Sequence, residues 1–318
     1  MKRCGQYCLL CLTCVITVNA QSENVAKVMK HIKKGDPVSL VLQDYTNKTE
    51  SAVAFLREMD SSQDDKGRLK VVRFASALAR KSRKVKGQQN VRDQDEFVTT
   101  MITFLDEDPS ERVRSAAAKG LLEIGLPKIV DRHNASVRRA VERHKDIDTL
   151  LLYASLPSCN KQSLVRIARK VKPDSKRSGY KLNSILARCG DNSAIELLLA
   201  EASELSEINN IYLYELVDAL SFVPEDRVQK YLAVELRSEL YVSLPGGGKI
   251  PKRNCFALAL VKMNRDNDSF PVKDEDYIFN ADDLDKIEQW CIDELGINIP
   301  LEPRKELMII PSFEPVLE

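Results

Sequence analysis

Basic side chains are concentrated in two stretches of this 318-residue chain, and the chemistry they offer is the binding of anions. Residues 66–92 contain ten Lys and Arg and no acidic residue, and residues 161–181 contain eight against Asp174 alone. Ammonium and guanidinium groups act on a partner as positive charges and hydrogen-bond donors. From the first stretch we select a candidate contact surface for an anionic partner: Arg80, Lys81, Arg83, Lys84 and Lys86.

The opposite charge gathers near the C-terminus. Residues 266–294 contain eleven acidic residues against Lys273 and Lys286. If the helices stack in sequence order, one end of the array is positive and the other negative, and the positive end would attract anionic partners. Charge runs also occur as ordinary solvated faces of helices, so both interpretations stay open.

Other reactive patterns are incomplete. No H-E-x-x-H is present, and His133 and His144 lie too far apart to bind one metal by themselves. Residues 246–249 lack the G-x-x-x-x-G-K-[ST] spacing that cradles phosphates, and no G-x-S-x-G is present. We therefore expect no catalytic residue, no metal and no cofactor.

Cysteine usage is split between the first twenty residues and the rest of the chain. Four of the eight cysteines lie before residue 21, and Cys159, Cys189, Cys255 and Cys291 remain. Our preferred disulfide joins Cys159 to Cys189, because about one repeat length separates them and an oxidising compartment permits the bond. The alternative is that all four are buried, reduced thiols.

Residues 1–20 have the pattern of a secretory signal peptide. Lys2 and Arg3 precede an apolar run over residues 7–18, and Val18-Asn19-Ala20 offers a cleavage site after Ala20. A buried N-terminal helix is the alternative. No later apolar run approaches 18 residues, so we expect a secreted or periplasmic chain with no membrane span.

Glycosylation sequons occur at Asn47, Asn134 and Asn267. If the chain comes from a eukaryotic secretory pathway, each is a glycan candidate. Asn134 is the weakest of the three, because its sequon runs into an expected helix start. We therefore select Asn47 and Asn267.

Composition and periodicity favour helices over sheet. Glycine is scarce, with 12 residues, and charged residues make up 30% of the chain. Apolar residues recur at helical spacing, and no stretch shows sustained strand alternation with hairpin turns. The predicted helices cover residues 191–203, 207–222, 226–242, 254–263 and 281–295, the fourth of them buried and the last ending at Gly296.

The clearest single helix follows the turn at Asp108. Its apolar stripe contains small residues, which let a neighbouring helix come close. A Val-Arg-x-Ala unit recurs four times, beginning at residues 72, 113, 137 and 165. The stripe consists of Val113, Ala116, Ala117, Gly120, Leu121 and Ile124.

This segment resembles the second helix of a HEAT repeat, with an Asp in the preceding turn and an Arg six residues later. Asp108 and Arg114 match that pattern. The resemblance implies that both residues link neighbouring repeats. It also implies a stacked array of helix pairs, in which each pair is stable only against its neighbours.

We therefore predict an all-α chain with an irregular, HEAT-like (armadillo-type) α-solenoid over residues 21–296. Loops near residues 244–251 and 264–281 interrupt it. Residues 297–318 contain four prolines and are expected to form an extended tail.

The predicted function is a non-catalytic scaffold that binds a protein or an anionic polymer on its surface, with no small-molecule substrate. Nucleic acid fits less well as a partner, because base-stacking aromatics are sparse among the basic residues. Secretion would also separate the chain from nucleic acid. Two alternatives remain. One is an enzyme acting in a basic groove, and the other is a purely structural component of an envelope or surface assembly.

Overall fold

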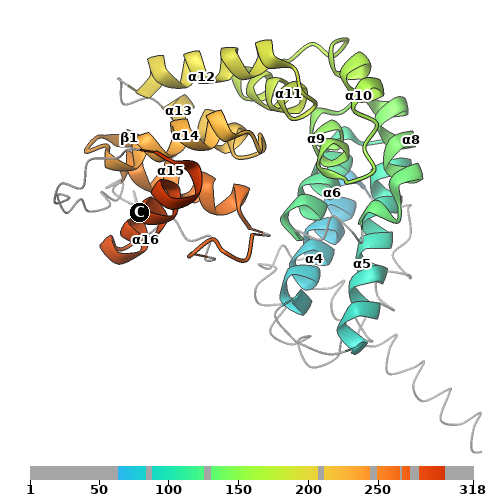
Figure 1. Ribbon diagram of the computed structural model, residues 1–318. Helices are drawn as coiled ribbons and strands as arrows, with labels where there is room; N and C mark the ends of the chain where they lie inside the picture. The colour runs from blue at the N-terminus through green and yellow to red at the C-terminus, as the bar shows by residue number, and fades with distance from the viewer. Residues whose placement is uncertain are drawn as a thin grey trace, which may run out of the picture. The chain divides into compact units, whose positions relative to one another are not determined.

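The computed structural model describes residues 64–83, 88–124, 130–206, 211–243, 249–265, 267–272 and 279–297. These residues are mostly α-helical, which confirms the predicted all-α class (Figure 1). The predicted signal peptide and nearly all of the predicted C-terminal tail lie outside them. The chain divides into two compact units, residues 1–159 (unit 1) and 160–318 (unit 2). Each unit is described by itself.

The described helices of unit 1 alternate between two layers. One layer contains α4, α6 and α9, in which each helix contacts the next, and α5 contacts α8 in the other. Contacts between α4 and α5, α5 and α6, and α8 and α9 join the layers. The bounds are α4 (Asp65–Arg83), α5 (Gln88–Glu107), α6 (Glu111–Ile124), α8 (Asn134–His144) and α9 (Ile147–Ser155).

Helix α6 buries the face that its sequence predicts. Five of the six stripe residues are buried, and Ala116 is half-buried. A Cβ atom added to Gly120 would lie 2.9 Å from the Cβ and Oγ atoms of Ser76 on α4. The missing side chain therefore allows α4 and α6 to approach each other closely.

Unit 2 shows the same alternation. Helix α11 contacts α13 and α13 contacts α15, while α12 contacts α14 and α14 contacts α16. Its helices are α10 (Lys161–Ala168), α11 (Lys176–Arg188), α12 (Asn192–Ser206), α13 (Ile211–Leu220), α14 (Asp226–Val234), α15 (Lys252–Met263), α16 (Ala281–Leu295) and the 3-10 helix η1 (Glu235–Arg237).

The core of unit 2 centres on α15. Every residue from Lys252 to Val261 is buried, which confirms the predicted burial of residues 254–263 except at Lys262 and Met263, which are half-buried. Phe270 packs edge-on against Trp290 of α16, with ring centroids 4.8 Å apart. Gly296 ends α16 in the left-handed conformation, at φ 63°, and serves as the predicted stop.

One predicted helix is too long. Residues 226–242 do not form a single helix, because α14 ends at Val234 and is followed by η1 and by strand β1 (Tyr241–Ser243). Strand β1 pairs antiparallel with β2 (Lys249–Pro251), so residues 249–251 are a strand and not a loop. Val242 lies opposite Ile250 and both are buried, so this β-branched pair joins the core of unit 2.

No helix within the described segments is both long enough and apolar enough to cross a membrane.

Candidate functional site

The predicted anion surface lies at the edge of the described chain. Arg80, Lys81 and Arg83 belong to the last turn of α4, while Lys84 and Lys86 lie outside the described residues. This surface therefore stays a prediction.

Arg114 joins α6 to the start of α9. Its guanidinium donates from Nε to Asp146 Oδ2 at 2.7 Å and from Nη2 to Asp146 Oδ1 at 3.1 Å. Its third nitrogen, Nη1, donates to the carbonyls of Asp108 and Pro109 at 2.8 and 2.9 Å. Both charged side chains are buried, with 8% and 7% of their surface exposed. This two-pronged contact holds the two helices in one register.

An equivalent contact joins α4 to the turn before α6, one helix earlier in the same layer. Arg68 of α4 donates from Nε to Asp108 Oδ2 at 2.7 Å and from Nη2 to Asp108 Oδ1 at 3.2 Å. Asp108 also accepts from the backbone N–H of Ser110 at 2.8 Å, within the turn before α6. In both contacts, the turn before a helix supplies an Asp to an Arg on the preceding helix of the same layer. Sequence reasoning selected Asp108 and Arg114 but missed their partners Arg68 and Asp146.

The second layer of unit 1 is joined in a related way. Asp106, at the end of α5, is 6% exposed, and its Oδ2 accepts from Nη2 of Arg139 on α8 at 2.9 Å. The backbone carbonyl of Asp106 accepts from Arg143 and contacts His144 Nε2, each at 3.0 Å. Arg143 and His144 therefore both hold α8 against the end of α5.

Unit 2 also joins helices that are next but one in sequence. Lys262 of α15 contacts Asp218 of α13 at 2.6 Å, and Arg227 of α14 contacts Glu196 of α12 at 2.5 Å. Arg237 of η1 forms a double contact with Glu288 of α16, which is 1% exposed. Because these partners are 31 to 51 residues apart, local sequence patterns give no signal for them.

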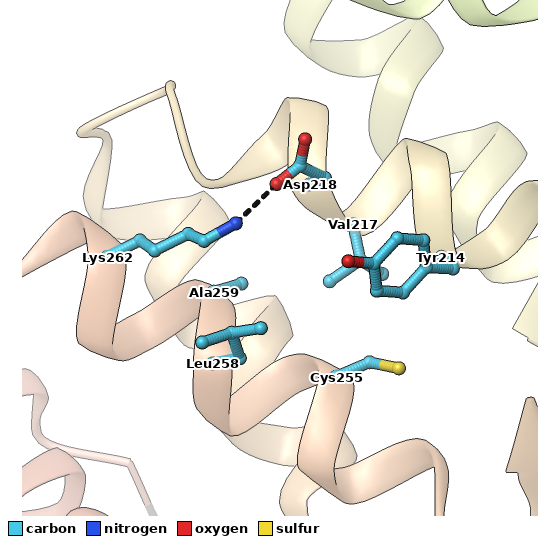
Figure 2. Close-up of a pocket in the computed structure, with 7 residues that line it drawn as sticks. All are labelled: Tyr214, Val217, Asp218, Cys255, Leu258, Ala259 and Lys262. Carbon is cyan, nitrogen blue, oxygen red and sulfur yellow. Dashed lines mark hydrogen bonds and ion pairs between the residues drawn. The ribbon is translucent and has the colours of Figure 1, made fainter. Parts of the chain in front are cut away.

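A small depression lies between α13 and α15, with the Asp218–Lys262 ion pair at one end and the Cys255 thiol at the other (Figure 2). Its volume is about 10 Å³, which is room for about one water molecule. Small-molecule sites typically occupy hundreds of cubic ångströms. The lining residues are Tyr214, Val217, Asp218, Cys255, Leu258, Ala259 and Lys262.

Burial suppresses the reactivity of two thiols in unit 2, Cys255 and Cys291. It raises the pKa of Cys255 to about 12, despite the opposing effect of Lys262, and raises the pKa of Cys291 to about 12. Both thiols therefore stay protonated at neutral pH and are poor nucleophiles. Cys159 and Cys189 are half-buried and belong to different units, so their disulfide stays a prediction.

The described sequons are engaged in local hydrogen bonds. Asn267 Oδ1 accepts from the N–H and Oγ of Ser269, at 3.1 and 2.9 Å. Asn134, the first residue of α8, donates from Nδ2 to Ser158 Oγ at 2.5 Å. Asn47 lies outside the described residues, and glycosylation at Asn47 and Asn267 stays a prediction.

A second basic surface lies on α10 and the turn after it. Lys161, Arg166, Lys170 and Lys172 are exposed, and within the described part of the chain none of them has an ion pair or hydrogen bond from its side chain. We call these four residues the α10 surface. Elsewhere in the described segments, no group of three or more His, Cys, Asp or Glu is placed to hold a metal.

No family model, curated protein or solved structure matches this chain. The HEAT resemblance therefore rests on the sequence pattern around Asp108 and Arg114.

Proposed function

We infer that this chain is a non-catalytic, HEAT-like α-solenoid scaffold that binds a macromolecular partner on its surface. The observation that carries this proposal is the alternation of the described helices between two layers, in which α4, α6 and α9 of unit 1 and α11, α13 and α15 of unit 2 contact one another in succession. Arrays of this kind present extended surfaces, and such surfaces bind proteins or polymers without chemistry.

The ion pairs described above support a fixed framework. Arg68–Asp108 and Arg114–Asp146 repeat the same contact between successive helices of one layer of unit 1. The depression between α13 and α15 has room for about one water and contains a protonated thiol, so it offers little to a small substrate. Exposed side chains are what the framework offers to a partner.

The proposed location is outside the cytoplasm, as a secreted or periplasmic protein. It is supported by the charged start, apolar run and cleavage pattern of residues 1–20. Arg80, Lys81, Arg83, Lys84 and Lys86 remain our proposed contacts for the partner.

In-cell cross-linking tests this function. Cells that produce the chain would be treated with a short cross-linker, and the chain would be purified under denaturing conditions. We expect an adduct with a protein or a polymer, reduced in an Arg83→Glu/Lys84→Glu/Lys86→Glu variant that keeps its helical circular dichroism. Recovery of the wild-type chain without any macromolecular adduct would refute the proposal.

A further inference from the structure

The α10 surface is a concentration of uncompensated positive charge. Its four cations fall within twelve residues, 161–172, which contain no acidic residue. All four are exposed, and the described part of the chain places no carboxylate in an ion pair with any of them. A surface of this kind attracts anions from solution.

The first two acidic groups that follow the α10 surface in sequence already have partners. Asp191 accepts from Arg169 at 2.8 Å and from the Ser193 hydroxyl at 2.5 Å. Asp174 accepts from the hydroxyls of Ser175 and Ser178 at the start of α11. These bonds hold the pKa of both carboxyls below the usual value, so both stay ionised within their own contacts.

The other cations of the stretch are also engaged. Arg177 contacts Glu215 at 3.6 Å, and Lys176 lies over the ring of Tyr212, 5.2 Å from its centroid. The structure therefore separates the basic stretch 161–181 into cations that contact other residues and the four of the α10 surface, which have no ion pair or hydrogen bond from their side chains within the described segments. The sequence alone does not make this distinction.

The composition of α10 and the turn after it argues against a protein or single-stranded nucleic acid as the ligand of the α10 surface. The large apolar side chains exposed in the described segments are Leu197, Tyr212, Val234 and Leu240, and none belongs to residues 160–175. Protein interfaces centre on buried apolar and aromatic anchors. Residues 160–179 contain no aromatic side chain on which a base could stack.

We propose that the α10 surface, formed by Lys161, Arg166, Lys170 and Lys172, binds a linear anionic polysaccharide through its sulfate or carboxylate groups. The proposal rests on the proposed function and names the class of partner at a second surface. Polysaccharide is favoured over duplex nucleic acid because the signal-peptide pattern of residues 1–20 predicts a location outside the cytoplasm. No bond is formed or broken, since the surface offers only charge and hydrogen-bond donors.

The test uses the full chain and heparin as the probe, with the dissociation constant measured over a series of salt concentrations. The α10 variant carries Lys161→Gln, Arg166→Gln, Lys170→Gln and Lys172→Gln. Its control neutralises three lysines and one arginine that are likewise exposed and have no side-chain partner in the described segments: Arg112→Gln, Lys230→Gln, Lys249→Gln and Lys286→Gln. The two variants have the same net charge.

Each cation that displaces a condensed counterion contributes about 0.7 to 0.9 to the slope of log affinity against log salt for nucleic acids, and we apply the same scale to heparin. Losing four such contacts should reduce the slope by about 3 and weaken binding at least about tenfold at ~0.1 M salt. The control variant should keep most of the wild-type slope. Equal slopes for the two variants would overturn the proposal.

Competition identifies the class of anion. Duplex DNA and polyglutamate would be added at equal charge to the heparin complex, and both should displace the chain less effectively than free heparin. Displacement by either competitor as effective as by heparin would overturn the polysaccharide assignment. Failure of heparin to bind at all would overturn the inference, while the in-cell cross-linking result would still decide the proposed function.

Discussion

Replacing Arg114 by Met should destabilise unit 1, because it leaves the buried carboxylate of Asp146 without its cation. Asp146 is 8% exposed and receives two bonds from the guanidinium. Met keeps much of the length of the Arg stem but donates no hydrogen bond, so the carbonyls of Asp108 and Pro109 also lose their side-chain donor.

The expected magnitude follows from the burial of both partners. Removing one member of a buried ion pair typically costs about 3–5 kcal/mol, because the other charge remains without compensation. The double variant Arg114→Met/Asp146→Asn removes both charges and should lose less than the sum of the two single variants. We expect a coupling energy of about 1–3 kcal/mol from this double-mutant cycle.

The assay is urea unfolding, followed by circular dichroism and by tryptophan fluorescence. Trp290 is the only tryptophan and lies on α16, so its fluorescence reports on unit 2 alone. Hydrogen exchange of peptides from α6 and α9 reports on unit 1. Arg138→Met is the matched control, since Arg138 pairs with Glu142 within α8 and both side chains are about half exposed.

We expect Arg114→Met to accelerate exchange in α6 and α9 and to lower the circular dichroism midpoint, while the Trp290 transition stays close to that of wild type. Arg138→Met should change neither. A loss of stability below about 1 kcal/mol for Arg114→Met, or a coupling energy near zero, would refute the argument that the pair fixes these helices.

Three further predictions concern single positions. Gly120→Ala should destabilise the chain by about 1–2 kcal/mol in urea unfolding, because overpacking against Ser76 outweighs the gain in helix propensity. As a control, Gly179→Ala should be neutral or stabilising, because the nearest atom to its added Cβ would be 4.0 Å away. A stabilised Gly120→Ala variant would contradict the close approach of α4 and α6. The Asp191 carboxyl should titrate in NMR with a pKa of about 2, below its usual 3.8, and its contacts should therefore contribute stability above pH 3.8 that is lost as the pH falls toward 2. Ser193→Ala and Arg169→Gln should each raise this pKa, and a variant that leaves it unchanged would contradict the contact that it removes. Cys255 and Cys291 should resist iodoacetamide in the folded chain and react fully in urea, and rapid labelling of either in the folded state would contradict their burial.

Periodicity predicted the elements whose burial is set locally. The face of α6, the enclosed helix α15 and the Gly296 stop of α16 each follow from residues within one helix or its cap. The hairpin of β1 and β2 was missed, because three-residue strands are too short to show alternation. Its pairing depends on Val242 meeting Ile250 across a connection that the sequence only marks as a loop.

The candidate sites were predictable only in part. The charge runs are visible in the sequence, but the division of residues 161–181 into engaged and unengaged cations depends on distant partners such as Asp191, in the turn before α12, and Glu215, on α13. The HEAT resemblance pointed to Asp108 and Arg114, whereas their partners Arg68 and Asp146 lie 40 and 32 residues away. Such contacts are set by the stacking of helices and not by local sequence.

The most direct test of the account is to map the in-cell cross-links at residue level. After cross-linking in the producing cells, the modified peptides of the chain would be identified by mass spectrometry. We expect one macromolecular partner whose cross-links cluster on the basic segments, residues 80–86 or 161–172. Absence of any macromolecular adduct, or cross-links confined to segments without these cations, would contradict it.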